Sequence, residues 1–149
     1  MAKKSKDTGK ITNRRASYDY ELGEQLVVGI QLTGAETKAL RLSHGQLRGA
    51  YVSVNNNELW LVNAQINSTT GVPVVEETRS RKLLAKKREI ERLLAARQAG
   101  NTIVPLEILT KGRFIKLRIA VGRGRKRYDK RETIRRREQQ REAARSISR

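Results

Sequence analysis

The last 28 residues of the chain contain very little that could enter a hydrophobic core. From Gly122 to Arg149 the large apolar side chains are Tyr128, Ile134 and Ile147, set among 12 Lys/Arg and 4 Asp/Glu. Burial of so few side chains cannot offset the entropy that an ordered segment loses. We therefore expect a flexible basic N-terminus at residues 1–12, a folded domain at 13–121, and a basic tail at 122–149 that is disordered when free.

This tail still has the composition of a potential helix. Residues 129–145 contain no Gly or Pro and are rich in Arg, Glu, Gln and Ala, which are good helix formers. Two Glu–Arg pairs at i,i+3 spacing, Glu138 with Arg141 and Glu142 with Arg145, favour the same conformation. We expect the tail to become helical on a polyanionic partner.

The net charge of +18 indicates that such a partner exists, because self-repulsion at this charge disfavours compaction. Nucleic acid, an anionic membrane and an acidic protein all fit. A membrane is disfavoured: no apolar run approaches the roughly 18–20 residues of a span. A membrane-surface helix would also need bulky apolar side chains that the tail lacks. The polar residues after Lys3, Lys4 and Lys6 do not resemble a signal peptide, so we expect a cytoplasmic protein.

The composition does not suggest an enzyme. With no Cys and one His, we expect neither a metal site nor a cofactor. His44, next to Gly45 at the end of a predicted helix, is interpreted as a side chain meeting the helix dipole. We find no set of catalytic residues and expect no small-molecule substrate.

Apolar periodicity predicts a mainly β domain with helices, of the α+β class. The predicted strands span residues 25–32, 50–54, 58–66, 102–109 and 113–121, and the predicted helices 33–42 and 81–99. Asn55-Asn56-Asn57 and Thr110-Lys111-Gly112 indicate two hairpins, and Pro105 suits an edge or a strand end. The strand count favours a small antiparallel barrel of the oligonucleotide-binding type with two or three helices.

Three clusters could contact RNA, with a solvated charged face as the alternative for each. Arginines can contact phosphates and aromatic rings can stack on bases. The clusters are Asn13-Arg14-Arg15 with Tyr18 and Tyr20, then Arg79, Arg81 and Lys82, and finally residues 123–131.

Several stretches together resemble a known family. They are Asn13-Arg14-Arg15-Ala16, residues 32–41 (LTGAETKALR), Tyr51-Val52, residues 78–84 (TRSRKLL) with 87–90 (KREI), and Tyr128-Asp129-Lys130-Arg131. In this order and spacing they resemble the SsrA-binding protein (small protein B) family, the bacterial partners of transfer-messenger RNA. The resemblance runs from about Asn13 to Arg141.

The resemblance implies a monomeric adaptor that is not an enzyme and acts in trans-translation, the rescue of stalled ribosomes. Its barrel would hold the tRNA-like domain of transfer-messenger RNA. Its tail would enter the decoding centre of the small subunit and the empty messenger channel, against ribosomal RNA. A structural ribosomal protein with a basic tail is the remaining alternative.

Site residues follow from the same resemblance. Those expected to bind transfer-messenger RNA are Asn13, Arg14, Arg15, Tyr18, Glu36, Lys38, Arg41, Arg79, Arg81 and Lys82. Those expected to meet the ribosome are Gly122, Arg123, Arg125, Lys126, Arg127, Tyr128, Asp129, Lys130, Arg131, Ile134, Arg135 and Arg136. Glu36 could accept hydrogen bonds from bases, hold a nearby Arg or Lys in place, or be structural. Ser17-Tyr18 departs from the family's usual Arg-His pair.

Overall fold

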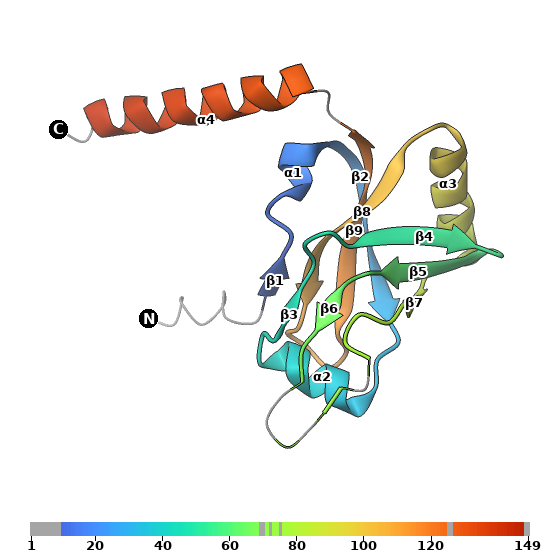
Figure 1. The fold of residues 1–149 in the computed structure, drawn as a ribbon. Coiled ribbons are helices and arrows are strands. Elements are labelled where there is room, and N and C mark those ends of the chain that lie inside the picture. The colour runs from blue at the N-terminus through green and yellow to red at the C-terminus, as the bar shows by residue number, and fades with distance from the viewer. Residues whose placement is uncertain (1–9, 69–70, 72, 75, 125–126, 148–149) are drawn as a thin grey trace.

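A closed ring of antiparallel strands forms the body of the protein in a computed structural model (Figure 1). The structure describes residues 10–68, 71, 73–74, 76–124 and 127–147. Starting from β8, the ring runs through β4, β5, β7, β2 and β9 and returns to β8. Ring closure leaves these six strands without a free edge, and it confirms the predicted fold class.

The strands vary widely in length. Their bounds are β1 Lys10–Thr12, β2 Tyr20–Ile30, β3 Gly45–Gln46, β4 Tyr51–Asn55, β5 Glu58–Val62, β6 Gln65–Ile66, β7 Arg81–Leu84, β8 Thr102–Leu109 and β9 Lys116–Gly124. β1 pairs with one end of β8, and β3 and β6 form a separate two-stranded ladder. The sheet therefore begins three residues before, and ends three residues after, the domain bounds predicted from sequence.

The core fills the interior of the ring. Alternate residues of its strands point inward; in β9, for example, Leu117 and Ile119 are buried while Lys116 is exposed. The most buried apolar side chains include Leu40, Leu59, Leu61, Ile66, Ile103, Leu117 and Ile119. This alternation is the period-two pattern that predicted the strands.

Both predicted hairpins are present. Asn56 and Asn57 have φ of 52° and 62° between β4 and β5, and Gly112 has φ of 90° between β8 and β9. Pro105, predicted at an edge or strand end, instead lies inside β8 beside the register shift between Pro105 and Glu107. A bulge tolerates the missing N–H of proline.

Four helices are described: α1 Ala16–Asp19, α2 Gly34–Arg41, α3 Lys87–Gln98 and α4 Arg127–Ile147. α2 matches the predicted helix. The prediction of one helix over 81–99 is wrong at its start, where β7 pairs with β5 and β2. Leu84, expected on the apolar stripe, is 49% exposed, whereas Arg81 is fully buried.

Two further strand predictions need correction. The strand expected over 58–66 is divided into β5 and β6, because Asn63 between them has φ of 67°. The strand expected over 25–32 begins earlier, at Tyr20, and contains an irregularity between Leu22 and Gln25.

α4 extends from the end of β9 and lies near α1, away from α2 at the other end of the ring (Figure 1). Nη2 of Arg137 on α4 lies 3.4 Å from Oγ of Ser17. The described side chains of α4, including Ile134 and five arginines, are exposed. Within the described residues, no helix is both long and apolar enough to span a bilayer.

Because α4 buries so little, we predict that its helical state depends on a partner. A peptide of residues 122–149 should give a mostly unfolded circular dichroism spectrum in dilute buffer. It should gain helical signal when a polyanionic RNA is added. A firmly helical spectrum in buffer alone would contradict the prediction.

Candidate nucleic-acid interface

Glu36 lies in the first turn of helix α2, where its side chain is buried. Thr33 caps the helix: its Oγ1 accepts a hydrogen bond from the Glu36 N–H at 3.2 Å, and Oε1 of Glu36 accepts one from the Thr33 N–H at 3.0 Å. This reciprocal capping box holds the carboxylate against the first turn of α2. Only 1% of the Glu36 side chain is exposed.

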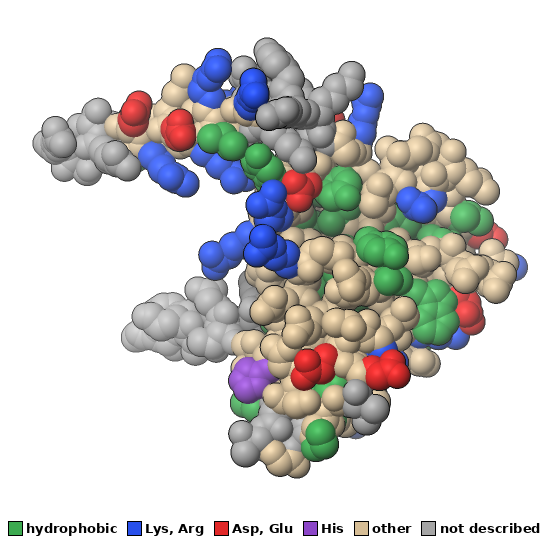
Figure 2. All heavy atoms as spheres, viewed as in Figure 1, with side chains coloured by type: hydrophobic (Ala, Val, Ile, Leu, Met, Phe, Trp, Pro, Cys, Tyr) green, Lys and Arg blue, Asp and Glu red, His purple; other side chains and the backbone are tan. Residues whose placement is uncertain are grey.

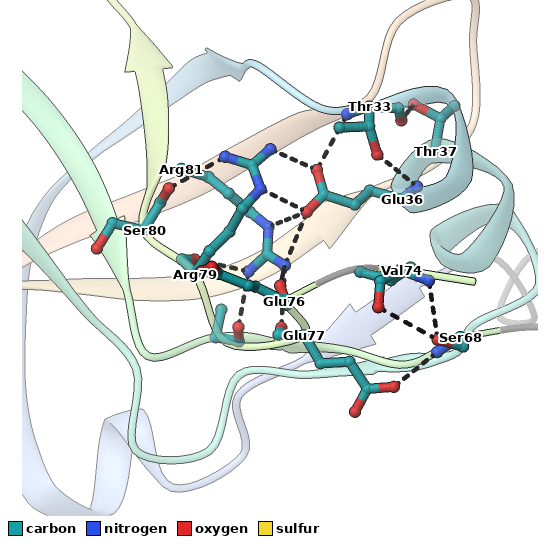
Figure 3. Close-up of polar contacts among 11 residues, drawn as sticks. Thr33, Glu36, Thr37, Ser68, Val74, Glu76, Glu77, Arg79, Ser80 and Arg81 are labelled. Carbon is teal, nitrogen blue, oxygen red and sulfur yellow. Dashed lines mark hydrogen bonds and ion pairs between the residues drawn. The ribbon is translucent and has the colours of Figure 1, made fainter.

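Two arginines bind this carboxylate: Arg79, which lies before β7, and Arg81, the first residue of β7 (Figure 3). Nε and Nη2 of Arg79 donate to the two oxygens of Glu36 at 2.9 and 2.7 Å, a bidentate arrangement. Nε of Arg81 donates to Oε2 of Glu36 at 2.9 Å. The structure thus brings Glu36 together with two arginines that the sequence analysis placed in a separate cluster.

Arg81 is a fully buried cation, and backbone carbonyls satisfy its remaining donors. Its Nη1 donates to the carbonyls of Ala64 at 2.8 Å and Arg79 at 3.0 Å. Its Nη2 donates to the carbonyl of Glu77 at 2.9 Å. One side chain therefore links the connection between β5 and β6, the loop before β7, and helix α2.

Burial raises the pKa of the Glu36 carboxyl, but hydrogen bonds from Arg79 and the Thr33 backbone, with the charge of Arg81, outweigh it. The net result is a pKa below the ordinary value. Burial lowers the pKa of Arg81 and the charge of Glu36 opposes that change. An arginine stays protonated under such conditions, so the cluster is an ion-paired one at neutral pH.

These positions assign different roles to the three residues. Glu36 and Arg81 are enclosed by protein, and their polar atoms are occupied by one another and by the backbone. Arg79 is 33% exposed and lies at the surface of the cluster. Glu36 therefore holds an arginine in place, one of the roles considered for it from sequence.

The first basic cluster begins in the turn between β1 and α1 and continues through α1 to the start of β2. The N–H of Asn13 donates to the Leu106 carbonyl at 2.7 Å, and its Nδ2 donates to the Pro105 carbonyl at 3.0 Å, at the bulge of β8. Arg14 is exposed beside it. The guanidinium of Arg15 lies 5.0 Å from the centroid of the Tyr18 ring.

A groove of about 520 Å³ begins at this cluster and runs along β4. Arg15, Tyr20, Arg48, Tyr51 and Arg97 are among the residues that line it, and they come from different parts of the chain. Figure 2 shows Lys and Arg side chains gathered beside α1 and along α4. Arg48 and Arg97 were not selected from sequence, because neither belongs to a basic run.

The other residues of the body that are expected to contact transfer-messenger RNA make no contact with the Glu36–Arg79–Arg81 ion pairs in the bonds described above. Lys38 is exposed on α2. Nζ of Lys82 is 3.1 Å from Oε2 of Glu58, an exposed ion pair. Arg41 donates hydrogen bonds to three backbone carbonyls of the β8–β9 loop, so it holds that loop against α2.

The residues expected to meet the ribosome fall into two groups, one in β9, which ends at Gly124, and one after it. Gly122 and Arg123 belong to β9, where a Cβ on Gly122 would lie 3.0 Å from Val104, so this glycine is needed for close packing. Arg125 and Lys126 lie outside the described residues. The side chains of residues 127–130, which include Arg127, Tyr128, Asp129 and Lys130, also lie outside them. Arg131, Ile134, Arg135 and Arg136 are exposed on α4.

The described residues include no cluster of three or more His, Cys, Asp or Glu side chains that could hold a metal ion. The candidate site consists of arginines, tyrosines and one buried carboxylate.

Residues 10–149 match the model of the SmpB protein family. The chain belongs to the SmpB family. It is 40% identical to the SsrA-binding protein of Lactococcus lactis subsp. lactis (strain IL1403), covering 99% of this chain and 97% of the relative. It is 42% identical to the SsrA-binding protein of Ligilactobacillus salivarius (strain UCC118), with the same coverage. These matches confirm the family predicted from the motifs.

A solved structure supports the same SmpB assignment. The chain is 36% identical to a protein in the structure described as "tmRNA-SmpB: a journey to the center of the bacterial ribosome". The TM-score is 0.68, and the match covers 85% of this chain and 95% of the solved one. The ring of strands is thus the fold of an SmpB protein.

We predict that Glu36→Gln lowers the free energy of unfolding by about 3–5 kcal/mol, because it leaves Arg81 buried without a counter-charge. The amide N–H₂ would also face a guanidinium. Urea denaturation at pH 7 measures the change. The matched control is Glu58→Gln, which breaks the exposed pair with Lys82 and should cost about 1 kcal/mol or less. Equal effects of the two substitutions would contradict the role of the cluster.

The cluster also predicts a pH dependence. In the unfolded chain the Glu36 carboxyl titrates near its ordinary pKa of about 4.3, and folding lowers this pKa. The contribution of Glu36 to stability is therefore full above about pH 4.3 and falls as the pH drops toward the folded-state pKa. The stability difference between wild type and Glu36→Gln should shrink between pH 7 and pH 3. A constant difference would refute this prediction.

Proposed function

We propose that this protein is an RNA-binding adaptor that binds the tRNA-like domain of transfer-messenger RNA and delivers it to stalled ribosomes in trans-translation. The match of residues 10–149 to the SmpB family carries the proposal. The names of its relatives, SsrA-binding proteins, and the ribosome complex of the solved neighbour support it.

The ring supplies the surface for transfer-messenger RNA in this proposal. Arg14, Arg15 and Arg79 are accessible cations in the segments between the elements; Tyr18 lies against Arg15, and Tyr51 lines the same groove as Arg15. Cations on a scaffold that is already ordered can meet phosphates without an additional ordering cost. Glu36 and Arg81 act indirectly, by fixing Arg79 and the start of α2.

The tail supplies the surface for the ribosome. α4 carries exposed arginines and few apolar side chains, a composition suited to a channel lined by ribosomal RNA. We infer that it enters the decoding centre and the empty messenger channel, and that residues 123–136 make most of those contacts. A segment of this kind can bind only where messenger RNA is absent.

The proposed adaptor is not an enzyme, and it needs no cofactor or small-molecule substrate. Its binding energy would come from phosphate contacts and base stacking, so its affinity for RNA should fall with salt. Since it acts on ribosomes during translation, we place it in the cytoplasm.

Truncation after Gly124 should separate the two roles. This cut keeps all of β9, so the ring should still fold and bind transfer-messenger RNA, while tagging of stalled peptides should be abolished. Gel mobility shift measures RNA binding, and a reconstituted translation reaction on a truncated message measures tagging. Loss of RNA binding with an intact fold would show that the proposed division is wrong, and unimpaired tagging would reject the role of the tail.

A further inference from the structure

The hairpin tip between β8 and β9 presents an aromatic ring to solvent. Phe114 is 69% exposed, more than any other large apolar side chain in the described part of the chain. Its neighbour Ile115 is buried in the core, so the backbone of the tip is anchored while the ring points away from it. Phe114 therefore adds little to the packing of the fold, and its ring is available to a partner.

Arg41 fixes the shape of this tip from helix α2. Its Nη1 donates to the carbonyls of Thr110 at 2.8 Å and Gly112 at 3.2 Å, and its Nη2 donates to the carbonyl of Arg113 at 2.9 Å. Three hydrogen bonds from one guanidinium hold the turn on both sides of Gly112. Since Glu36 anchors α2 at its other end, the tip is attached to a helix that is itself fixed by the Glu36 ion pairs.

The charged residues next to Phe114 in the sequence are all positive. Residues 110–116 contain Lys111, Arg113 and Lys116 and no acidic residue. The three cations are exposed, and the Arg113 guanidinium lies 5.7 Å from the centroid of the Phe114 ring. An exposed ring beside cations combines the two contacts that unpaired nucleotides make with proteins, base stacking and phosphate pairing.

We propose that the β8–β9 tip is an RNA contact in which Phe114 stacks on an unpaired base while Lys111 and Arg113 meet the neighbouring phosphates. Arg41 is the positioning residue of this contact. The inference rests on the proposed function and deepens it, because it assigns an unpaired nucleotide of the bound RNA to a specific part of the ring. It also gives Arg41 a role other than direct RNA binding.

The place of the tip agrees with this assignment. β9 runs from the tip to Gly124, and nine residues of strand span roughly 30 Å. The tip and the start of α4 are thus at opposite ends of one strand. RNA held at the tip leaves the tail free to enter a different site.

Equilibrium binding of the full-length chain to the isolated tRNA-like domain, at several salt concentrations, tests the proposal. Phe114→Ala should weaken binding about tenfold or more, the loss expected for one base–aromatic stack. The dependence on salt should stay unchanged, because no charge is removed. Phe114→Trp should restore the affinity, and Arg113→Ala should reduce the salt slope by about 1.

Leu42→Ala is the matched control, because Leu42 is also apolar and exposed, next to Arg41 in sequence. It should change the affinity less than twofold. Arg41→Met should weaken binding less in the Phe114→Ala background than in the wild-type background, because only the contacts of Lys111 and Arg113 then remain to be lost; a general loss of stability would not produce this coupling. Thermal melting confirms that each variant is folded.

The outcomes distinguish this inference from the proposed function. If the wild-type chain does not bind the tRNA-like domain, both are rejected. If the wild-type chain binds and Phe114→Ala binds equally well, the tip is not an RNA contact and the proposed function stands. Equal losses for Leu42→Ala and Phe114→Ala would also overturn the stacking role.

Discussion

The buried ion pair between Glu36 and Arg81 is the interaction on which the rest of the site depends. Removing two charges from water is expensive, and only a complete set of hydrogen bonds compensates for it. Here the carboxylate accepts from two guanidinium groups and one backbone N–H, and Arg81 donates to backbone carbonyls as well. The start of α2 and the loop before β7 are therefore fixed together.

The arrangement explains how a strongly basic protein keeps a defined surface. At +18, accessible arginines repel one another, and flexible side chains would spread apart. Arg79 is held by Glu36 and Arg41 by loop carbonyls, so neither is free to move away from its position. The buried carboxylate of Glu36 thus orients Arg79, and backbone carbonyls orient Arg41.

Local sequence patterns predicted the fold where local geometry decides it. Asparagine and glycine at the hairpin turns and the period-two alternation of the strands each have a direct structural meaning. The strand β7 was missed because its first residue is Arg81, and a pattern that counts charged residues as exposed cannot place a buried arginine. Glu36 and its partners are 43 and 45 residues apart, so only the folded chain shows that they touch. Family motifs selected the same residues, but they could not distinguish a surface contact from a buried support.

β9 is hydrogen-bonded along both edges, to β2 and to β8. In a strand held on two sides, the loss or gain of a single residue turns its inward side chains outward unless a bulge absorbs the change. Strand pairing therefore constrains the spacing between the β8–β9 tip and the end of β9. Family members whose tails extend to different distances would differ in the number of residues after Gly124. β9 ends there, so strand pairing no longer restricts the length of the chain.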